Sequence, residues 1–161
     1  MEYMNQLTIF LDVVIATVLT AAIGAERESA NKPAGIRTNM IVGGASCLIV
    51  AITIPLIDFI NQYNPQEILR VDPIRTLEAL VVGVSFIGAG TILKHKGKER
   101  VEGLTTAATL LYCAGIGICT ALKQYVLAIC VTLLIVFVNY MVRLIVRKFL
   151  KAEPEAPARP E

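Results

Sequence analysis

The chain has 161 residues, enough for one domain of ordinary size. Hydrophobic residues make up 55% of it and charged residues only 17%, whereas about a quarter of a soluble domain is charged. The net charge of +2 comes with no basic patch interleaved with aromatic residues, which argues against binding to nucleic acid. The composition therefore predicts an all-α integral membrane protein.

Five stretches reach the roughly 20 mostly apolar residues that a helix needs to cross a bilayer. In chain order they run from about Tyr3 to Ala25, Thr38 to Ile57, Pro73 to Leu93, Leu104 to Leu122 and Tyr125 to Val146. The first is too long for a signal-peptide core and lacks a basic segment before it, so we expect a retained helix. These stretches predict a polytopic bundle of five transmembrane helices over residues 1–150. Residues 151–161, with three prolines, are expected to form a disordered cytoplasmic tail.

Lysine and arginine are divided unevenly between the two sides of these spans. Arg70, Arg75 and Lys123 fall on one side, and all the others fall on the opposite side. Cytoplasmic segments carry the excess of Lys and Arg in membrane proteins. The N-terminus is therefore predicted outside and the C-terminus in the cytoplasm, which an odd number of spans also requires.

Polar and small residues of each span fall on one helical face at 100° per residue. The predicted faces are Asp12, Ala16, Leu19, Ile23 and Glu26; Asn39, Gly43, Ser46, Val50 and Thr53; Glu78, Val82, Ser85 and Ala89; Thr106, Thr109, Cys113, Gly117 and Thr120; and Tyr125, Thr132, Val136, Asn139 and Arg143. Close helix packing explains most of these residues. The two intramembrane acids, Asp12 and Glu78, are costly in hydrocarbon and are candidates for a cation or proton site. Both could instead be protonated and silent, because burial raises the pKa of a carboxyl group.

The loop predicted outside, between the second and third spans, carries Asp58, Glu67 and Asp72. Their hard oxygen atoms could bind Mg²⁺ weakly, or the three acids could simply be solvated. Asp72 followed by Pro73 also has the form of a helix start.

Other reactive side chains form no recognisable site. The four cysteines fall inside spans without a CxxC pair, which favours packing over disulfides or zinc. His95 is the only histidine, and no nucleophile or metal-ligand constellation surrounds it, so we expect no enzyme and no cofactor beyond weak Mg²⁺ binding.

Four motifs lie at the span ends predicted to face the cytoplasm. They are Gly24-Ala25-Glu26-Arg27-Glu28, Ala34-Gly35-Ile36-Arg37-Thr38, Phe86-Ile87-Gly88-Ala89-Gly90 and Gly103-Leu104-Thr105-Thr106-Ala107-Ala108. We expect Gly35 to allow a tight turn, and Thr105 or Thr106 to cap the fourth span. An ion-pair cluster of Glu26, Arg27 and Arg37 is a further expectation. The candidate residues of this rim are Glu26, Arg27, Glu28, Gly35, Arg37, Thr38, Gly88, Gly90, Gly103, Thr105 and Thr106.

In order and spacing, these motifs resemble the membrane domain of the MgtC/SapB family, which includes YhiD-like proteins, over about residues 7 to 145. The chain departs from the family pattern at Ser85, where Gly is usual, and at Leu111, where Trp is frequent. The resemblance implies a multi-pass protein of the bacterial inner membrane without established catalytic activity. It also implies links to growth in low Mg²⁺, survival in macrophages, acid tolerance and restraint of the F-type ATP synthase.

The function expected from this resemblance is a non-enzymatic effect on Mg²⁺ or proton balance, through regulation of another membrane protein. That partner would be one such as the F-type ATP synthase or a Mg²⁺ transporter. The alternative is a small transporter or channel for Mg²⁺ or H⁺, with Asp12 and Glu78 along its path. Five short helices bury modest lateral area, so a homodimer in the lipid bilayer is also expected.

Overall fold

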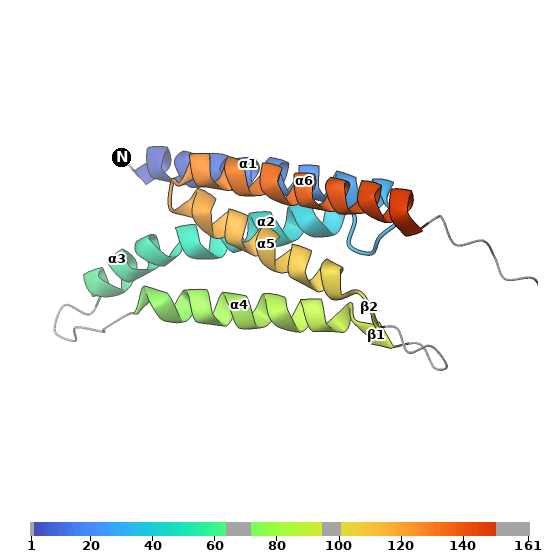
Figure 1. Cartoon of the computed structure of the whole chain (residues 1–161). Coiled ribbons are helices and arrows are strands. Elements are labelled where there is room, and N and C mark those ends of the chain that lie inside the picture. The colour runs from blue at the N-terminus through green and yellow to red at the C-terminus, as the bar shows by residue number, and fades with distance from the viewer. Residues whose placement is uncertain (1, 64–71, 95–100, 151–161) are drawn as a thin grey trace, which may run out of the picture.

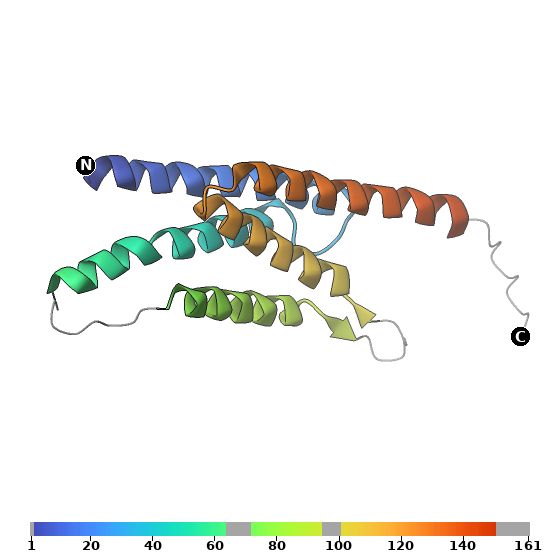
Figure 2. The same ribbon diagram turned by 60° about the vertical axis from the view of Figure 1, so that its left-hand side comes forward.

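The computed structural model describes residues 2–63, 72–94 and 101–150, and their elements are shown in Figures 1 and 2. The helices are α1 (Glu2–Ser29), α2 (Ile36–Ala51), α3 (Thr53–Tyr63), α4 (Pro73–Gly90), α5 (Leu104–Ala121) and α6 (Tyr125–Leu150). Two short strands, β1 (Leu93–Lys94) and β2 (Val101–Glu102), pair antiparallel between α4 and α5. Glu67, His95 and the tail 151–161 lie outside the described residues, so what was predicted for them stays a prediction.

Five helical stretches are long and apolar enough to cross a membrane, as the sequence predicts. They are Asn5–Ser29, Ile36–Ile60, Pro73–Gly90, Leu104–Ala121 and Tyr125–Ile145. The fold class of an all-α, five-span bundle is thereby confirmed, with one two-residue strand pair added to it.

The second span is a broken helix rather than a continuous one. It consists of α2 and α3, separated at Ile52. Pro55 has no N–H to donate to the carbonyl group of Ala51, four residues earlier, and its ring crowds that turn. A proline is the usual cause of such a break in a membrane helix.

Both ends of α4 have local causes. At its start, Asp72 is the N-cap and accepts a hydrogen bond from the amide of Ile74 at 3.0 Å, with Pro73 in the first turn, as predicted. The helix ends at Gly90, three residues before the predicted Leu93, because the chain turns into β1. Gly103 lets β2 turn into α5 close to this helix end: its φ is +92°, and a Cβ atom there would lie 2.1 Å from the carbonyl oxygen of Thr91.

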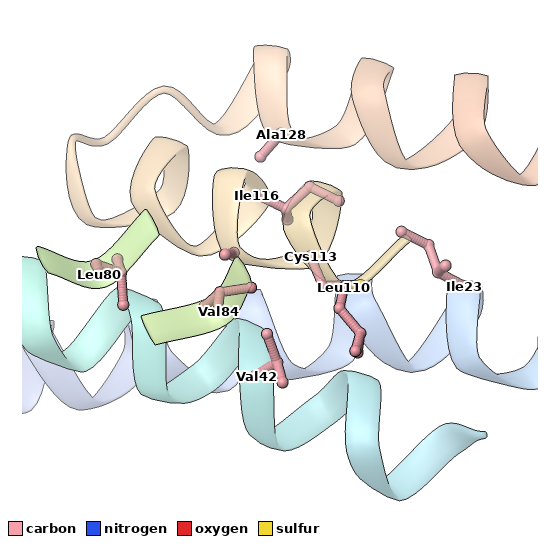
Figure 3. Close-up of a cluster of buried hydrophobic side chains, with 9 residues drawn as sticks. Ile23, Val42, Leu80, Val84, Leu110, Cys113, Ile116 and Ala128 are labelled. Atoms are coloured by element: carbon pink, nitrogen blue, oxygen red, sulfur yellow. The ribbon is translucent and has the colours of Figure 1, made fainter. Parts of the chain in front are cut away.

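Helix α5 lies at the centre of the bundle, where it contacts α1, α2, α4 and α6. Its buried side chains, including Leu110 and Ile116, form the core with Ile23 of α1 and Ala128 of α6 (Figure 3). The backbones of α2 and α5 approach closely here. A Cβ atom on Gly117 would lie only 2.3 Å from the carbonyl oxygen of Gly43, so glycine is needed for this approach.

Polarity is inverted relative to a soluble protein. The outer surface carries large apolar side chains such as Phe86 and Val126, while polar residues such as Asn39, Thr106 and Thr120 are buried. The predicted polar faces of α1, α2, α5 and α6 turn toward the bundle. The predicted face of α4 (Glu78, Val82, Ser85 and Ala89) is exposed instead, because α4 packs through Leu80, Val84 and Gly88.

Candidate functional site

Two polar clusters lie at opposite ends of α1. One is centred on Asp12, and the other on Glu26 and Arg27, 14 residues or about 21 Å further along the helix. We call the end of the bundle where α1 and α4 end and α2 and α5 begin the motif end. The four sequence motifs all lie there, and in Figure 1 it is the end that carries β1 and β2.

At the opposite end, Asp12 is buried and fully engaged. The turn between α5 and α6 places Lys123, with φ +60°, so that its ammonium group pairs with one carboxylate oxygen of Asp12. The Tyr125 hydroxyl donates to the other oxygen at 2.7 Å. Partial burial opposes the charge of Lys123, but the hydrogen bond and charge attraction from Asp12 outweigh it, so the pKa of Lys123 is raised.

The structure does not bring the two intramembrane acids together. Asp12 is 1% exposed, whereas Glu78 lies on the exposed face of α4 and makes no side-chain hydrogen bond or ion pair within the described residues. Asp58 on α3 and Asp72 at the start of α4 are both exposed. In the described part of the chain, no three His, Cys, Asp or Glu side chains gather in a group able to hold a metal ion.

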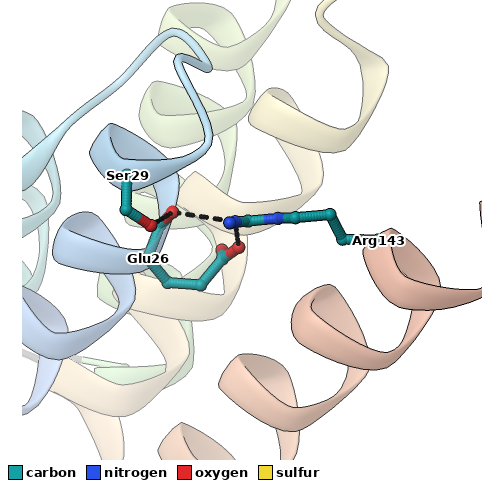
Figure 4. A network of polar contacts seen from close by, with 3 residues as sticks. All are labelled: Glu26, Ser29 and Arg143. Carbon is teal, nitrogen blue, oxygen red and sulfur yellow. Dashed lines mark hydrogen bonds and ion pairs between the residues drawn. The ribbon is translucent and has the colours of Figure 1, made fainter. Parts of the chain in front are cut away.

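At the motif end, Glu26 of α1 forms an ion pair with Arg143 of α6 (Figure 4). The same guanidinium group donates to the backbone carbonyl of Glu26 at 3.1 Å, and the Ser29 hydroxyl donates to that carbonyl at 2.7 Å. The predicted ion-pair cluster of Glu26, Arg27 and Arg37 was therefore wrong, because neither arginine forms an ion pair with Glu26 among the described residues. Arg37 is exposed, and Arg143, far along the chain, pairs with Glu26 in its place.

Arg27 is the most unusual residue of this cluster, because it is charged but only 4% exposed. It donates to the Thr106 hydroxyl, in the first turn of α5, at 2.5 Å, and its Nε atom has no partner within the described residues. Thr106 therefore does not cap α5, as was predicted for it or Thr105; the N-cap is Gly103. We call Glu26, Arg27, Thr106 and Arg143 the rim cluster.

The rim cluster is incompletely satisfied. Among the described residues, the buried polar side-chain atoms without a hydrogen bond are Oε2 of Glu26, Nε of Arg27 and Nδ2 of Asn139. Asn139 lies one turn before Arg143, on the same face of α6. Each such buried atom carries a desolvation cost, and their concentration in one region marks this region as the candidate functional site.

The second motif is organised by hydrogen bonds around the start of α2. A carboxylate oxygen of Glu28 accepts from the amide of Ile36 at 3.1 Å, and so caps α2 from the neighbouring helix. Asn39 donates to the carbonyl groups of Ala34 and Gly35 at 2.6 and 2.9 Å. It also accepts from the Cys113 thiol at 3.0 Å, which ties α2 to α5.

Gly35 allows the Glu28 carboxylate to approach the backbone closely, whereas the sequence predicted that it would allow a tight turn. Its φ is −77°, which any residue can adopt, and the left-handed conformation falls on Ala34 instead, at φ +56°. A Cβ atom on Gly35 would lie 2.8 Å from Oε2 of Glu28, so glycine leaves room for the carboxylate that caps α2.

The remaining motif residues divide into packed and exposed groups. Gly88 is buried, and a Cβ atom there would lie 3.2 Å from that of Ala107, so α4 meets α5 closely. Four others are exposed and make no side-chain hydrogen bond within the described residues: Arg37, Thr38, Gly90 and Thr105. The fold gives no packing reason for the three polar side chains among them, Arg37, Thr38 and Thr105.

Sequence reasoning did not place Lys123, Asn139 or Arg143 in a site. Lys123 is the lone charged residue between two apolar spans, and Asn139 and Arg143 fall on the predicted inner face of the fifth span. Those signals were present, but the partners of Lys123 and Arg143 lie more than 100 residues away along the chain.

Comparisons with known proteins agree with the motif pattern. The model of the MgtC family matches residues 13–148. SapB from Bacillus subtilis is 36% identical over 73% of this chain and 49% of its own length. MgtC from Salmonella typhimurium is 34% identical over 88% of this chain and 55% of its own length. YhiD from Escherichia coli, named provisionally as a magnesium transporter, is 34% identical over 73% of this chain and 52% of its own length.

The chain spans about half the length of these curated relatives. No solved structure matches it. The matched relatives are bacterial, and five apolar helices make this chain a multi-pass membrane protein. On the strength of a family match that covers most of its length, the chain belongs to the MgtC family.

Proposed function

We propose that this protein is a non-enzymatic component of the bacterial inner membrane that affects Mg²⁺ homeostasis or proton balance by binding and regulating another membrane protein. Membership of the MgtC family and the magnesium-transport name of the YhiD relative support the link to Mg²⁺. We further propose that the N-terminus lies outside and the motif end faces the cytoplasm, because Arg27, Lys32, Arg37, Lys94 and Arg143 all lie at that end.

The observation that carries the regulatory proposal is that some motif residues are buried and bonded within the bundle while others are exposed and unbonded. Glu26, Arg27 and Thr106 are buried or half-buried and link α1 to α5 and α6. Arg37 and Thr105 remain exposed at the same end without an intramolecular role in the described chain. Exposed polar residues beside a rigid, buried network are suited to contact the cytoplasmic rim of a partner protein.

The test compares Arg37→Ala with Lys32→Ala, a matched loss of an exposed positive charge five residues away, outside the motif. Each full-length variant replaces the wild type in a strain whose growth in low Mg²⁺ depends on this protein. We expect Arg37→Ala to lose growth support and the wild type to retain it, at equal amounts of protein in the membrane. Lys32→Ala is expected to behave as the wild type.

The partner itself is sought by photocrosslinking from position 37, followed by purification in mild detergent. A crosslinked membrane protein that is absent when the probe stands at position 32 would support regulation by direct binding. Recovery of this chain alone, together with normal growth of Arg37→Ala, would reject the proposal.

The alternative function is transport of Mg²⁺ or H⁺, and one observation favours it. Asp12 is a buried carboxylate within a span, and such residues mark ion and proton pathways in many membrane proteins. Purified protein in liposomes should then carry a flux that is lost in Asp12→Asn. Absence of flux in the wild type would reject transport, and full flux with Asp12→Asn and Glu78→Gln combined would remove both acids from the pathway.

A further inference from the structure

A groove of about 640 Å³ runs between α2 and α4. Its walls are almost wholly apolar, with Ile41, Ala45 and Ile49 from α2 facing Gly83 and Ile87 from α4. Ile41, Ile49 and Ile87 in its walls are exposed, so this groove opens toward the surrounding membrane. In a bilayer such an opening is filled by a lipid chain or by another helix.

The two ends of the groove differ in charge. Arg75, in the first turn of α4, lines one end, and Ile41 and Ile87 line the other. Arg75 is exposed, and its guanidinium group makes no hydrogen bond or ion pair within the described residues. The groove therefore presents, at one end of an apolar channel, a cation without a partner in the described part of the chain.

The length of the channel matches one leaflet of a membrane. From Arg75 to Ile87 the helix rises about 18 Å at 1.5 Å per residue. Half of the hydrocarbon core of a bilayer is about 15 Å thick. An acyl chain lying along the groove from Ile87 would thus bring its headgroup to the level of Arg75.

From this charge and length we propose that the groove between α2 and α4 is a phospholipid-binding site. One acyl chain lies between the two helices, and Arg75 binds the phosphate of the headgroup. A guanidinium group is suited to this role because its planar fork donates two parallel hydrogen bonds to phosphate oxygens. The lipid belongs to the leaflet that holds the start of α4. Its acyl chain fills the space between α4 and α2, and α4 itself contacts mainly α5.

Gly83 offers a way to block the groove without disturbing the rest of the fold. A Cβ atom at Gly83 meets nothing within 4 Å, so a leucine there extends into the groove. Gly115, in the middle of α5, is equally open at Cβ but lies outside the groove. Gly115→Leu is therefore a matched control, since both changes add the same side chain to the interior of a helix.

The experiment is native mass spectrometry of the full chain in mild detergent, titrated with phosphatidylglycerol or with a diacylglycerol of the same acyl chains. For the wild type we expect one tightly bound phosphatidylglycerol per chain. Charge-assisted hydrogen bonds contribute about 1.5–3 kcal/mol, so the phosphate should improve affinity over diacylglycerol about tenfold or more. Gly83→Leu should lose binding of both molecules, and Gly115→Leu should retain it.

Arg75 is tested separately at an exposed position where misfolding is not a concern. Arg75→Gln should bind phosphatidylglycerol no better than diacylglycerol, while Arg75→Lys should keep most of the preference. Equal lipid binding by Gly83→Leu and Gly115→Leu would overturn the proposal. So would the loss of a dimer in Gly83→Leu with lipid binding unchanged, because the groove would then be an interface between protein chains.

Discussion

The ion pair between Glu26 and Arg143 joins the first helix to the last, and its removal tests whether the rim cluster holds the bundle together. In Arg143→Met the side-chain volume is nearly kept, but the Glu26 carboxylate loses its ion-pair partner and the Glu26 backbone carbonyl loses a hydrogen bond. The Glu26 side chain is 10% exposed and that of Arg143 is 24% exposed, so water replaces little of what is lost. Breaking a pair buried to this degree costs about 3 kcal/mol.

A double variant distinguishes the cost of an unpaired buried charge from the net stabilisation by the ion pair. Replacing both partners, as Glu26→Gln with Arg143→Met, removes the uncompensated charge. A buried ion pair stabilises a protein little more than neutral residues of similar volume do. The double variant should therefore recover most of the stability that Arg143→Met loses. Lys32→Met is the control for removing an exposed cation, with an expected change within about 0.5 kcal/mol.

The cysteines of the chain supply the assay. Cys47 and Cys113 are buried, while Cys119 is partly exposed and Cys130 is exposed. With Cys119 and Cys130 replaced by alanine, a maleimide dye reacts only when the bundle opens, and its rate against temperature reports stability. A loss below about 1 kcal/mol in Arg143→Met, or a double variant as unstable as the single one, would refute this account of the cluster.

Three further outcomes follow from the packing and the charges. Gly117→Val should destabilise the bundle by about 1–3 kcal/mol, because its Cβ atom would lie 2.3 Å from the Gly43 carbonyl oxygen. Gly115→Val is the control, and equal thermal stability of the two variants would contradict this prediction. Thr106→Val should cost about 1–3 kcal/mol in the same assay, since it leaves the buried guanidinium of Arg27 without its hydrogen bond, whereas Thr106→Ser should keep that bond. The raised pKa of Lys123 means that its pairing with Asp12 stabilises the folded state below about pH 10.5 and is lost as pH rises through the higher folded-state pKa. The melting temperature of the wild type should therefore fall above about pH 10.5, and in Lys123→Met it should start lower and show less of this alkaline fall.

The spans and the faces of four helices followed from local sequence. Apolar length marks a membrane helix without reference to any neighbour, and a helical repeat places Asn39, Gly43 and Ser46 on one face whatever packs against it. Asp72 and Pro73 marked the start of α4 for the same local reason. The break at Ile52 could also have been read from Pro55, which stands inside the predicted second span.

The pairing of charges was decided only by the tertiary structure. Arg37 is near Glu26 in sequence and Arg143 is far, yet Arg143 reaches Glu26 because α6 returns beside α1. The same return brings Lys123 to Asp12, so the buried acid pairs with a cation from the other end of the chain. The exposed polar face of α4 was likewise undetermined, since periodicity groups residues on a face without saying whether that face meets protein or lipid.

By itself, the sequence determined that this protein crosses the membrane five times, because hydrophobic length and helical period are properties of single segments. Only the tertiary structure decided which motif residues form the rim cluster and which remain exposed. The physical reason is that a charged side chain in a membrane is satisfied by whichever partner the helix packing brings within reach. That packing depends on close approaches such as the one between Gly43 and Gly117, which involve two helices at once.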